Sequence, residues 1–270
     1  MTDKQSDALD VREQYQDDRN LNARIALHAR FSTNPYGWSR WVFDHLTDLP
    51  EDARILELGC GPGDLWAANR TRIPSEWELT LTDFSSGMVE AAQAKLADLN
   101  RQVTTRVVDA QAIPFEDGAF DAVIANHMLY HVPDRQRALH EIRRVLQTLG
   151  TFYATTVGDQ HMAQLWSLVE PFVPDIRERT SKVSRGFTLE NGDNQLGEVF
   201  AHIARYDYKD ALEVTEVRPV IAYLRSSSTL MDCTLEASQW ATVRRTVAAH
   251  IEIKGAFHIH KASGIFIAHG

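Results

Sequence analysis

The spacing of apolar residues divides the chain into a helical start, an alternating middle and a mixed end. From residue 11 to residue 46, apolar side chains recur every three to four residues, which predicts helix. Pro35 disfavours helix at Asn34 and Gly37 is a turn former, so we expect two helices separated at residues 34–37.

Between residues 54 and 156, short apolar runs alternate with helical patterns. This alternation is typical of parallel βαβ units whose sheet is covered by helices on both faces. The expected strands are 54–58, 78–82, 103–108, 120–125 and 151–156. The expected helices are 64–70, 86–99 and 135–149, with Gly150 capping the last one.

After residue 156 the alternation stops. Residues 158–202 contain two short helical patterns and a loop, and we expect this insertion to act as a lid. Two further strands, 204–215 and 257–269, and helices at 215–225 and 235–250 complete the pattern. We predict that these two strands form an antiparallel edge of the sheet.

The prediction is therefore a single α/β domain over residues 1–270, with a doubly wound, seven-stranded, mostly parallel sheet. Residues 1–46 form an N-terminal helical cap, residues 50–156 the ligand-binding core, and residues 158–202 the lid insertion. Residues 203–270 supply the edge strands and their helices.

Composition narrows the class of partner. The formal net charge is −9, whereas nucleic-acid-binding proteins usually carry a basic face, so nucleic acid is not an expected partner. The first 18 residues lack the apolar region of a signal peptide, and no run of about 18 apolar residues occurs. Cys60 and Cys233 are expected to be free thiols. We expect a cytoplasmic monomer or homodimer with no membrane partner.

Glycines follow the first expected strand directly. Gly59, Gly61 and Gly63 allow a tight turn and let the backbone approach a ligand closely. In open α/β sheets, ligands bind beyond the carboxyl ends of the strands. Glu57 brings a carboxylate to the same strand end, where we expect it to attract an amino group.

Polar residues also end the next three strands. Asp83 is placed to accept hydrogen bonds from two ribose hydroxyls. Asp109, with Ala110 and Gln111 after it, suits the amino edge of adenine. Asn126 and His127 end the fourth strand. The agreement of four strand ends is stronger evidence for a nucleoside-type ligand than the glycines alone.

A nicotinamide dinucleotide is the first alternative. Its G-x-G-x-x-G motif requires a third glycine at position 64, where this chain has Asp64. A carboxylate beside a diphosphate would also repel it. The pattern therefore favours a ligand without phosphate.

Together these segments resemble the class I S-adenosylmethionine (SAM)-dependent methyltransferases, in the small-molecule branch similar to ubiquinone/menaquinone-type enzymes. The matching segments are residues 55–63, 81–85, 108–115 and 120–127. The resemblance implies a Rossmann-like fold, SAM as the cofactor and S-adenosylhomocysteine as its product. It also implies that the glycine loop holds the methionine moiety, Asp83 the ribose and Asp109 the adenine. Phe84 and Met88 match positions that pack on the adenosine. Residues 146–150 depart from the family's usual Lys-Pro-Gly-Gly turn, which is structural.

Methyl transfer needs alignment of the reactants more than a strong base. A base is required only where the acceptor must lose a proton. By family analogy His127 and His131 face the methyl group; the alternative is that both are structural. Tyr15, in an N-terminal helix that would fold over the cofactor, and Tyr130 are further candidates.

The remaining candidates are weaker. Arg24, His28 and Arg30 crowd one helix, where positions 24 and 28 share a face and Arg30 points elsewhere. A solvated face is the simpler interpretation, and the alternative is that Arg30 or a neighbour binds the SAM carboxylate. For His161 a surface helix position is favoured over a place in the pocket lining, and for Glu190 a turn is favoured over entry into the pocket. His258 and His260 share a strand face, but no carboxylate cluster completes a site, so no metal is predicted.

Aromatic residues outside the strands suggest the acceptor. They are Phe31, Tyr36, Trp38, Trp41, Trp166, Phe172 and Phe187. Because small-molecule pockets are mostly apolar and aromatic, we expect an aromatic or heteroaromatic metabolite as the methyl acceptor. Two alternatives stay open: a protein methyltransferase and a SAM-binding regulatory module without catalysis. A lid favours catalysis, since it excludes water.

Overall fold

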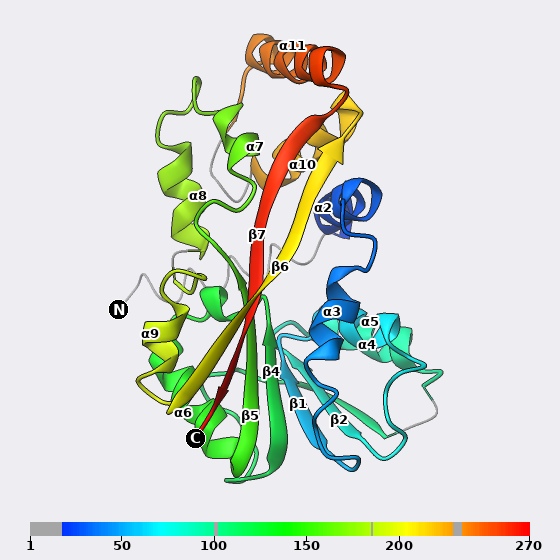
Figure 1. Ribbon diagram of the computed structural model, residues 1–270, viewed down its shortest axis with the longest axis vertical. Coiled ribbons are helices and arrows are strands. Elements are labelled where there is room, and N and C mark those ends of the chain that lie inside the picture. The colour runs from blue at the N-terminus through cyan, green and yellow to red at the C-terminus, as the bar shows by residue number, and fades with distance from the viewer. Residues whose placement is uncertain (1–17, 100–101, 185, 229–233) are drawn as a thin grey trace.

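The computed structural model describes residues 18–99, 102–184, 186–228 and 234–270. Within these ranges seven strands form one sheet in the order β3-β2-β1-β4-β5-β7-β6 (Figure 1). Strands β1 to β5 are parallel, and β7 pairs antiparallel with both β5 and β6. The predicted mostly parallel α/β sheet with an antiparallel edge is confirmed.

The strands are β1 (Arg54–Leu58), β2 (Glu78–Asp83), β3 (Val103–Val107), β4 (Phe120–Asn126), β5 (Leu146–Val157), β6 (His202–Val214) and β7 (Phe257–His269). Helices before and within the parallel part are α2 (Asp18–Phe31), α3 (Trp38–Asp44), α4 (Asp64–Ala68), α5 (Ser86–Leu96), η1 (Leu129–His131) and α6 (Arg135–Val145). Those that follow are α7 (Ala163–Ser167), α8 (Ile176–Ser184), α9 (Gly192–Leu196), α10 (Val217–Ser228) and α11 (Ala237–Lys254).

Both faces of the parallel part are buried. On β1, Ile55 and Leu56 point to opposite faces and belong to different apolar clusters. Leu56 packs in the cluster that includes Ile142 of α6, whereas Ile55 packs in the cluster that includes Phe43 of α3 and Leu65 of α4. This two-sided cover explains why the parallel strands read as continuous apolar runs.

The β6–β7 hairpin is longer than the sheet to which it belongs. Residues 263–269 of β7 pair with β5, whereas residues 257–262 continue past its end, still paired with β6 (Figure 1). This extension supports a third apolar cluster. The cluster includes Leu27 of α2, Leu165 of α7, Leu212 of β6, Val220 of α10, Val247 of α11 and Ile259 of β7.

The predicted end of the helix at 135–149 is wrong. Helix α6 ends at Val145 and β5 begins at Leu146. The ladder with β4 shifts register there, and Leu149 is 93 % exposed. Gly150 caps no helix; a Cβ at this position would lie 2.9 Å from Cδ2 of Leu146, so the glycine permits close packing inside the strand.

The N-terminal segment is tied to the hairpin. Ser32 forms a β-bridge with Leu212, and the Thr33 N–H donates to the Ala211 carbonyl at 2.9 Å. The segment from α2 to α3 is thereby held beside β6. Tyr15 and Cys233 lie outside the described residues. Cys60 is a buried free thiol, as predicted.

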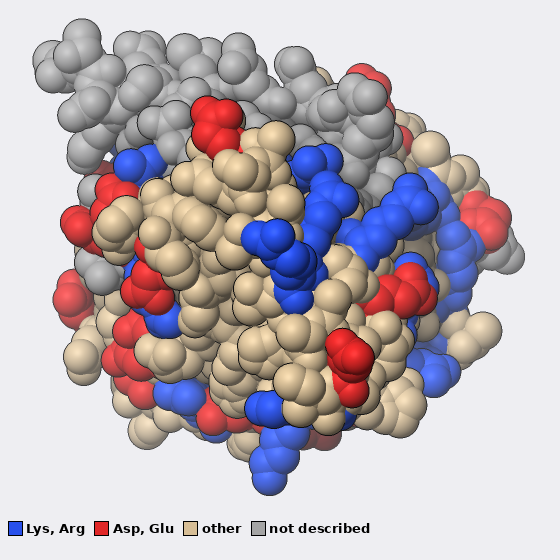
Figure 2. Space-filling view, turned by 90° about the horizontal axis from the view of Figure 1, so that it is seen from above, with Lys and Arg blue, Asp and Glu red and all other residues tan. Residues whose placement is uncertain are grey.

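Seen from the end where α10 and α11 lie, the surface carries Lys and Arg side chains with Asp and Glu side chains among them (Figure 2). In the described ranges no helix is long and apolar enough to cross a membrane.

Candidate cofactor and acceptor site

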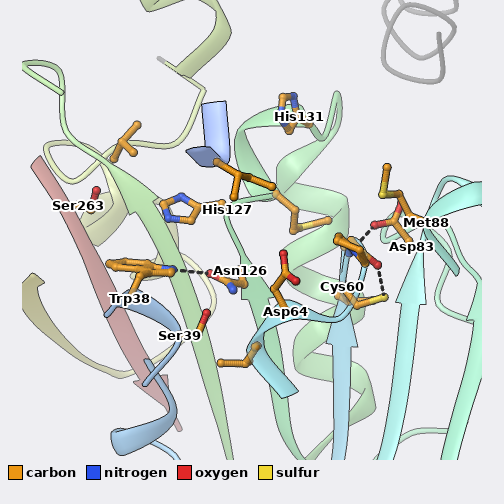
Figure 3. A pocket seen from close by; sticks show the side chains of 18 of the residues that line it. Trp38, Ser39, Cys60, Asp64, Asp83, Met88, Asn126, His127, His131 and Ser263 are labelled. Atoms are coloured by element: carbon orange, nitrogen blue, oxygen red, sulfur yellow. Dashed lines mark hydrogen bonds between the residues drawn. The ribbon is translucent and has the colours of Figure 1, made fainter. Parts of the chain in front are cut away.

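A cavity of about 1250 Å³ opens beyond the carboxyl ends of β1, β2 and β4 and beside the residues that follow β3 (Figure 3). Residues from all four strand ends line it, as do residues of the N-terminal segment and of the hairpin. Single small-molecule sites usually measure roughly 300–1,000 Å³. The cavity therefore has room for more than one ligand.

The glycine loop has the backbone that its composition predicts. Gly59, Gly61 and Gly63 have φ angles of 67°, 52° and 79°. A Cβ at Gly59 would lie 2.7 Å from Cβ of Met128, so packing excludes a side chain there. A Cβ at Gly61 would meet no protein atom within 4 Å, and this residue lines the cavity. Gly61 therefore leaves its backbone open to a ligand.

Asp83 is bound to the glycine loop. Its Oδ2 accepts the Gly61 N–H at 3.0 Å, and its Oδ1 accepts the Ser85 N–H at 2.8 Å. Burial raises the pKa of Asp83, and hydrogen bonds from the backbone N–H groups of Ser85, Gly61 and Phe84 oppose that rise. Each oxygen retains a lone pair that can accept a further bond. The carboxylate faces the cavity beside Met88, as a ribose-binding group would require (Figure 3).

Asp109 is oriented by the residue two positions after it. Its Oδ1 accepts the Gln111 backbone N–H at 2.9 Å and the Gln111 side-chain amide at 3.0 Å. The Gln111 Oε1 accepts the Asp134 N–H at 3.1 Å. Both Gln111 side-chain atoms are thus engaged by protein, so Gln111 positions Asp109. Asp109, Ala110 and Phe84 all line the cavity.

Glu57 does not line the cavity, contrary to its predicted role at an amino group. Its side chain is buried and accepts the Trp66 Nε1–H at 2.6 Å. The pKa of Glu57 is raised to about 7, mainly by burial; the Trp66 bond opposes this rise and the charges of Asp83 and Asp64 add to it. Glu57 therefore anchors helix α4 behind the glycine loop.

Asn126 lies between the side of the cavity that contains Asp83 and Met88, which we call the cofactor half, and the side that contains Ser263 (Figure 3). Its Oδ1 accepts the Thr155 hydroxyl at 2.7 Å and the Trp38 Nε1–H at 3.4 Å. No bond within the described residues engages its amide Nδ2, which leaves a donor for a ligand. Trp38 thus links α3 of the N-terminal segment to the end of β4.

His127 has a φ angle of 55°, which is uncommon for a residue other than glycine. Its N–H donates to the Thr155 hydroxyl at 2.9 Å, and its ring centroid lies 4.9 Å from that of Trp38. The pKa of His127 is lowered to about 4, mainly by burial and in addition by the charges of His28, Lys261 and His131. The ring is therefore neutral near pH 7. His131 also lines the cavity, whereas Tyr130 does not.

The end of the cavity opposite Asp83 and Met88 is polar and buried. Ser263 marks this end in Figure 3. We call the set that lines it the acceptor end: His28, Ser32, His161, Asp210, Lys261 and Ser263. The Asp210 carboxylate, 0 % exposed, forms an ion pair with Lys261, which is 10 % exposed. His161 occupies the less favoured of its two expected positions, because its turn packs against β7 and the ring faces the cavity rather than a helix surface.

The structure brings a different arginine to the cavity from the one predicted. Arg30 pairs with Glu216 through Nη2 and Oε1 at 2.5 Å and does not line the cavity. Arg40 of α3 does line it. Sequence reasoning missed Arg40 because the direction of α3 depends on how residues 32–37 turn. The side chain of Arg24 lies outside the described set.

Most of the aromatic residues assigned to the acceptor are structural. Tyr36 and Trp38 line the cavity. The other five pack in the apolar clusters of the sheet faces and the hairpin: Phe31, Trp41, Trp166, Phe172 and Phe187. Residues 158–202, the predicted lid, contribute His161 to the lining.

Two weaker candidates lie elsewhere. Glu190 accepts the Asp159 N–H at 3.0 Å, and His258 pairs with Glu213 at 2.7 Å. No group of three or more His, Cys, Asp or Glu residues with metal-binding geometry occurs in the described ranges.

The family model described as a methyltransferase domain matches residues 55–150. Residues 55–150 are thus similar to a methyltransferase domain, and the seven-stranded sheet has the Rossmann-like fold of the class I SAM-dependent methyltransferases. The cofactor of that class is SAM.

Two curated relatives illustrate the likeness. The chain is 31 % identical over 115 residues to the ubiquinone/menaquinone biosynthesis C-methyltransferase of Idiomarina loihiensis, covering 42 % of this chain and 45 % of the relative. It is 31 % identical over 182 residues to the malonyl-[acyl-carrier protein] O-methyltransferase of Geobacter sulfurreducens, covering 65 % of each chain. The chain thus spans about half the length of most of the curated relatives it matches.

Solved structures share the fold. The phosphoethanolamine N-methyltransferase 2 of Haemonchus contortus, in complex with phosphomonomethylethanolamine and S-adenosylhomocysteine, matches with a TM-score of 0.58. The sequence identity is 16 %, and the match covers 94 % of this chain and 57 % of that one.

Proposed function

We propose that this protein binds SAM at the ends of its parallel strands and transfers the methyl group to a small molecule held in the other half of the same cavity. One observation carries the proposal. A single cavity of about 1250 Å³ joins the Gly61–Asp83–Asp109 set to a second, separately built end at Lys261 and Ser263.

The residues present suit SAM. The backbone of Gly61 is open, Asp83 and Asp109 offer carboxylate acceptors, and Arg40 is the lining cation that we assign to the carboxylate of the methionine moiety. Asp64 beside the loop disfavours a phosphate. When bound, the cofactor supplies an electrophilic methyl group on a positively charged sulfur.

The chain's own contribution is alignment. Trp38, His127 and Asn126 surround the junction between the two halves, and orientation of this kind supplies up to about 7–11 kcal/mol of barrier reduction. With its pKa lowered to about 4, His127 is a weak base at neutral pH. We therefore assign it to orienting the acceptor rather than to removing a proton.

We further propose that the acceptor is aromatic or heteroaromatic. Trp38 and Tyr36 supply the flat apolar wall, and the ring of His127 lies 4.9 Å from that of Trp38. The named relatives differ in the acceptors that their names state, so the acceptor must be argued from this chain's own lining.

The first experiment separates cofactor binding from catalysis. Isothermal titration with SAM should show binding, and Asp83→Asn should weaken it by about 1.5–3 kcal/mol, since hydrogen bonds to a charged group are lost. Asp98→Asn, at an exposed carboxylate paired with Arg70, is the matched control and should leave the affinity unchanged.

Catalysis is then tested by incubating the protein with SAM and a panel of aromatic natural products. Release of S-adenosylhomocysteine with a methylated product is the expected result. SAM binding without methyl transfer to any member of the panel would count against the aromatic acceptor. An unchanged affinity in Asp83→Asn would refute the ribose assignment.

A further inference from the structure

The turn between β5 and α7 presents His161 to the acceptor end. The Gly158 N–H donates to the Ala262 carbonyl at 2.9 Å, and the Met162 N–H donates to the His260 carbonyl at 2.9 Å. Met162 has a φ angle of 55°, a strained conformation that persists only where surrounding contacts fix it. Strand β7 therefore holds this turn in one conformation.

One nitrogen of the His161 ring is bound by the same strand. Nδ1 lies 3.0 Å from the Ala262 carbonyl oxygen, 3.2 Å from the Ala262 nitrogen and 3.4 Å from the Ser263 hydroxyl. Nε2 has no hydrogen-bond partner within the described residues and is not sealed from the cavity. The backbone thus fixes the ring orientation and leaves Nε2 for a ligand.

The acceptor end carries no net charge near pH 7. The pKa of His161 is lowered to about 3, mainly by burial and in addition by the charges of His28, His127 and Lys261. Burial likewise lowers the pKa of His28 to about 4, with Lys261 lowering it and Asp210 raising it. The Lys261 ammonium is balanced by the buried Asp210 carboxylate. An anionic group entering here would find no unpaired cation among the residues of the acceptor end.

We propose, on the basis of the proposed function, that the methyl acceptor is an uncharged flat molecule bearing a hydroxyl group, and that His161 Nε2 binds this hydroxyl. His161 is thus a specificity-determining residue. A hydroxyl suits both tautomers of the ring, because it donates to an unprotonated Nε2 and accepts from a protonated one. The apolar body of the acceptor then lies toward Trp38 and His127, between its own hydroxyl group and the cofactor half of the cavity.

Binding of three matched probes to the protein loaded with S-adenosylhomocysteine tests the proposal by equilibrium dialysis. β-Naphthol bears a neutral hydroxyl, β-methylnaphthalene lacks it, and β-naphthoate carries a charge instead. The wild-type protein should bind β-naphthol roughly three- to tenfold more tightly than β-methylnaphthalene, the worth of one neutral hydrogen bond. β-Naphthoate should bind most weakly of the three.

His161→Asn isolates the ligand contact from the structural one. Its amide nitrogen can replace Nδ1 at Ala262, but no atom replaces Nε2. We expect the preference for β-naphthol to disappear while β-methylnaphthalene binds as before. His258→Asn is the control, because His258 is an exposed histidine on β7, the strand that also contains Ala262. This variant should retain the preference for β-naphthol.

The outcomes separate two failures. If S-adenosylhomocysteine itself does not bind, the proposed function fails. If it binds but the probes show no preference, do not bind at all, or keep their preference in His161→Asn, the inference about the acceptor is wrong and the cofactor assignment stands.

Discussion

At the scale of single residues, Gly61 and Gly255 form a natural pair for an experiment. Both have positive φ angles, 52° and 83°, and a Cβ at either would meet no protein atom within 4 Å. They differ only in place, since Gly61 lines the cavity and Gly255 ends helix α11.

Alanine at either position should lower the free energy of unfolding by about 1–2 kcal/mol, the usual cost of left-handed backbone for a residue with a Cβ. Gly61→Ala alone should also weaken SAM binding, by about tenfold, because crowding of a packed contact typically costs about 1–3 kcal/mol. Urea unfolding and calorimetry measure the two effects. Equal SAM affinities in the two variants would show that the Gly61 backbone does not contact the cofactor.

Glu57 gives a pH dependence with a definite sign. Because burial raises its pKa to about 7, the folded protein binds a proton that the unfolded chain releases near its ordinary value of 4.5. The contribution of Glu57 to stability is therefore full below about pH 4.5 and is lost as the pH rises toward 7.

Glu57→Gln should remove about 3 kcal/mol of this pH-dependent change while keeping an acceptor for the Trp66 N–H. Unfolding by urea at several pH values from 4.5 to 8 provides the measurement. Glu51→Gln, at an exposed position, should keep the wild-type slope. If the free energy of unfolding of Glu57→Gln changed with pH as it does in the wild type, Glu57 would be ionised in the folded protein throughout this range.

Sequence reasoning succeeded for residues whose place follows from strand ends alone. Asp83, Asp109 and Asn126 line the cavity because parallel strands deliver their carboxyl ends to one edge. It failed for Glu57 and Arg30. Their partners, Trp66 and Glu216, are set by how α4 packs beside β1 and how α2 packs beside α10 rather than by spacing. The spacing of residues along the chain does not show which side chains of separate elements will contact each other.

At the scale of elements, Asp210 of β6 joins the N-terminal segment to the hairpin. Its carboxylate accepts the Ser32 hydroxyl at 2.5 Å and the Asn34 N–H at 3.0 Å, besides pairing with Lys261. Burial raises the pKa of Asp210, but the hydrogen bonds from Lys261, Ser32 and Asn34 and the charge of Lys261 together lower it by more. The carboxylate is therefore held in its charged form.

Asp210→Asn should lower the free energy of unfolding by about 3 kcal/mol, because it leaves the Lys261 ammonium buried without its counter-charge. Adding Lys261→Met should recover most of that loss. Urea unfolding of the single and double variants gives the coupling, and Asp98→Asn, at an exposed ion pair, should change stability by less than about 1 kcal/mol. A double variant no more stable than the single one would contradict this account.

Element boundaries were predictable where turn residues mark them. The Asn34–Gly37 break and the start of α6 at Arg135 agree with the chain's pattern, and Asp134 caps α6 by accepting the Arg137 N–H at 3.2 Å. The end of α6 was not predictable, because residues 146–149 keep a helical spacing of apolar side chains. Pairing of Leu146 with Phe120 overrides that local preference.

At the scale of the whole molecule, two different parts of the fold form the cavity. The parallel strands provide the cofactor half, whose order follows from the βαβ rhythm. The acceptor end comes from the N-terminal segment, the β5–α7 turn and the hairpin extension. The first was readable from sequence; the second depends on contacts between residues far apart in the chain, such as Ser32 with Asp210.

The extension of β6 and β7 past the parallel strands gives the molecule two regions that can change independently. In this register Lys261 lies opposite Asp210 and, like Ser263, lines the cavity, whereas the intervening Ala262 contacts the His161 turn. A shift of β7 by one residue against β6 would turn Lys261 and Ser263 away from the cavity and bring their neighbours in the strand toward it. Replacing side chains on this hairpin without changing its length is therefore the route by which the acceptor range can be redesigned while the glycine loop is left untouched.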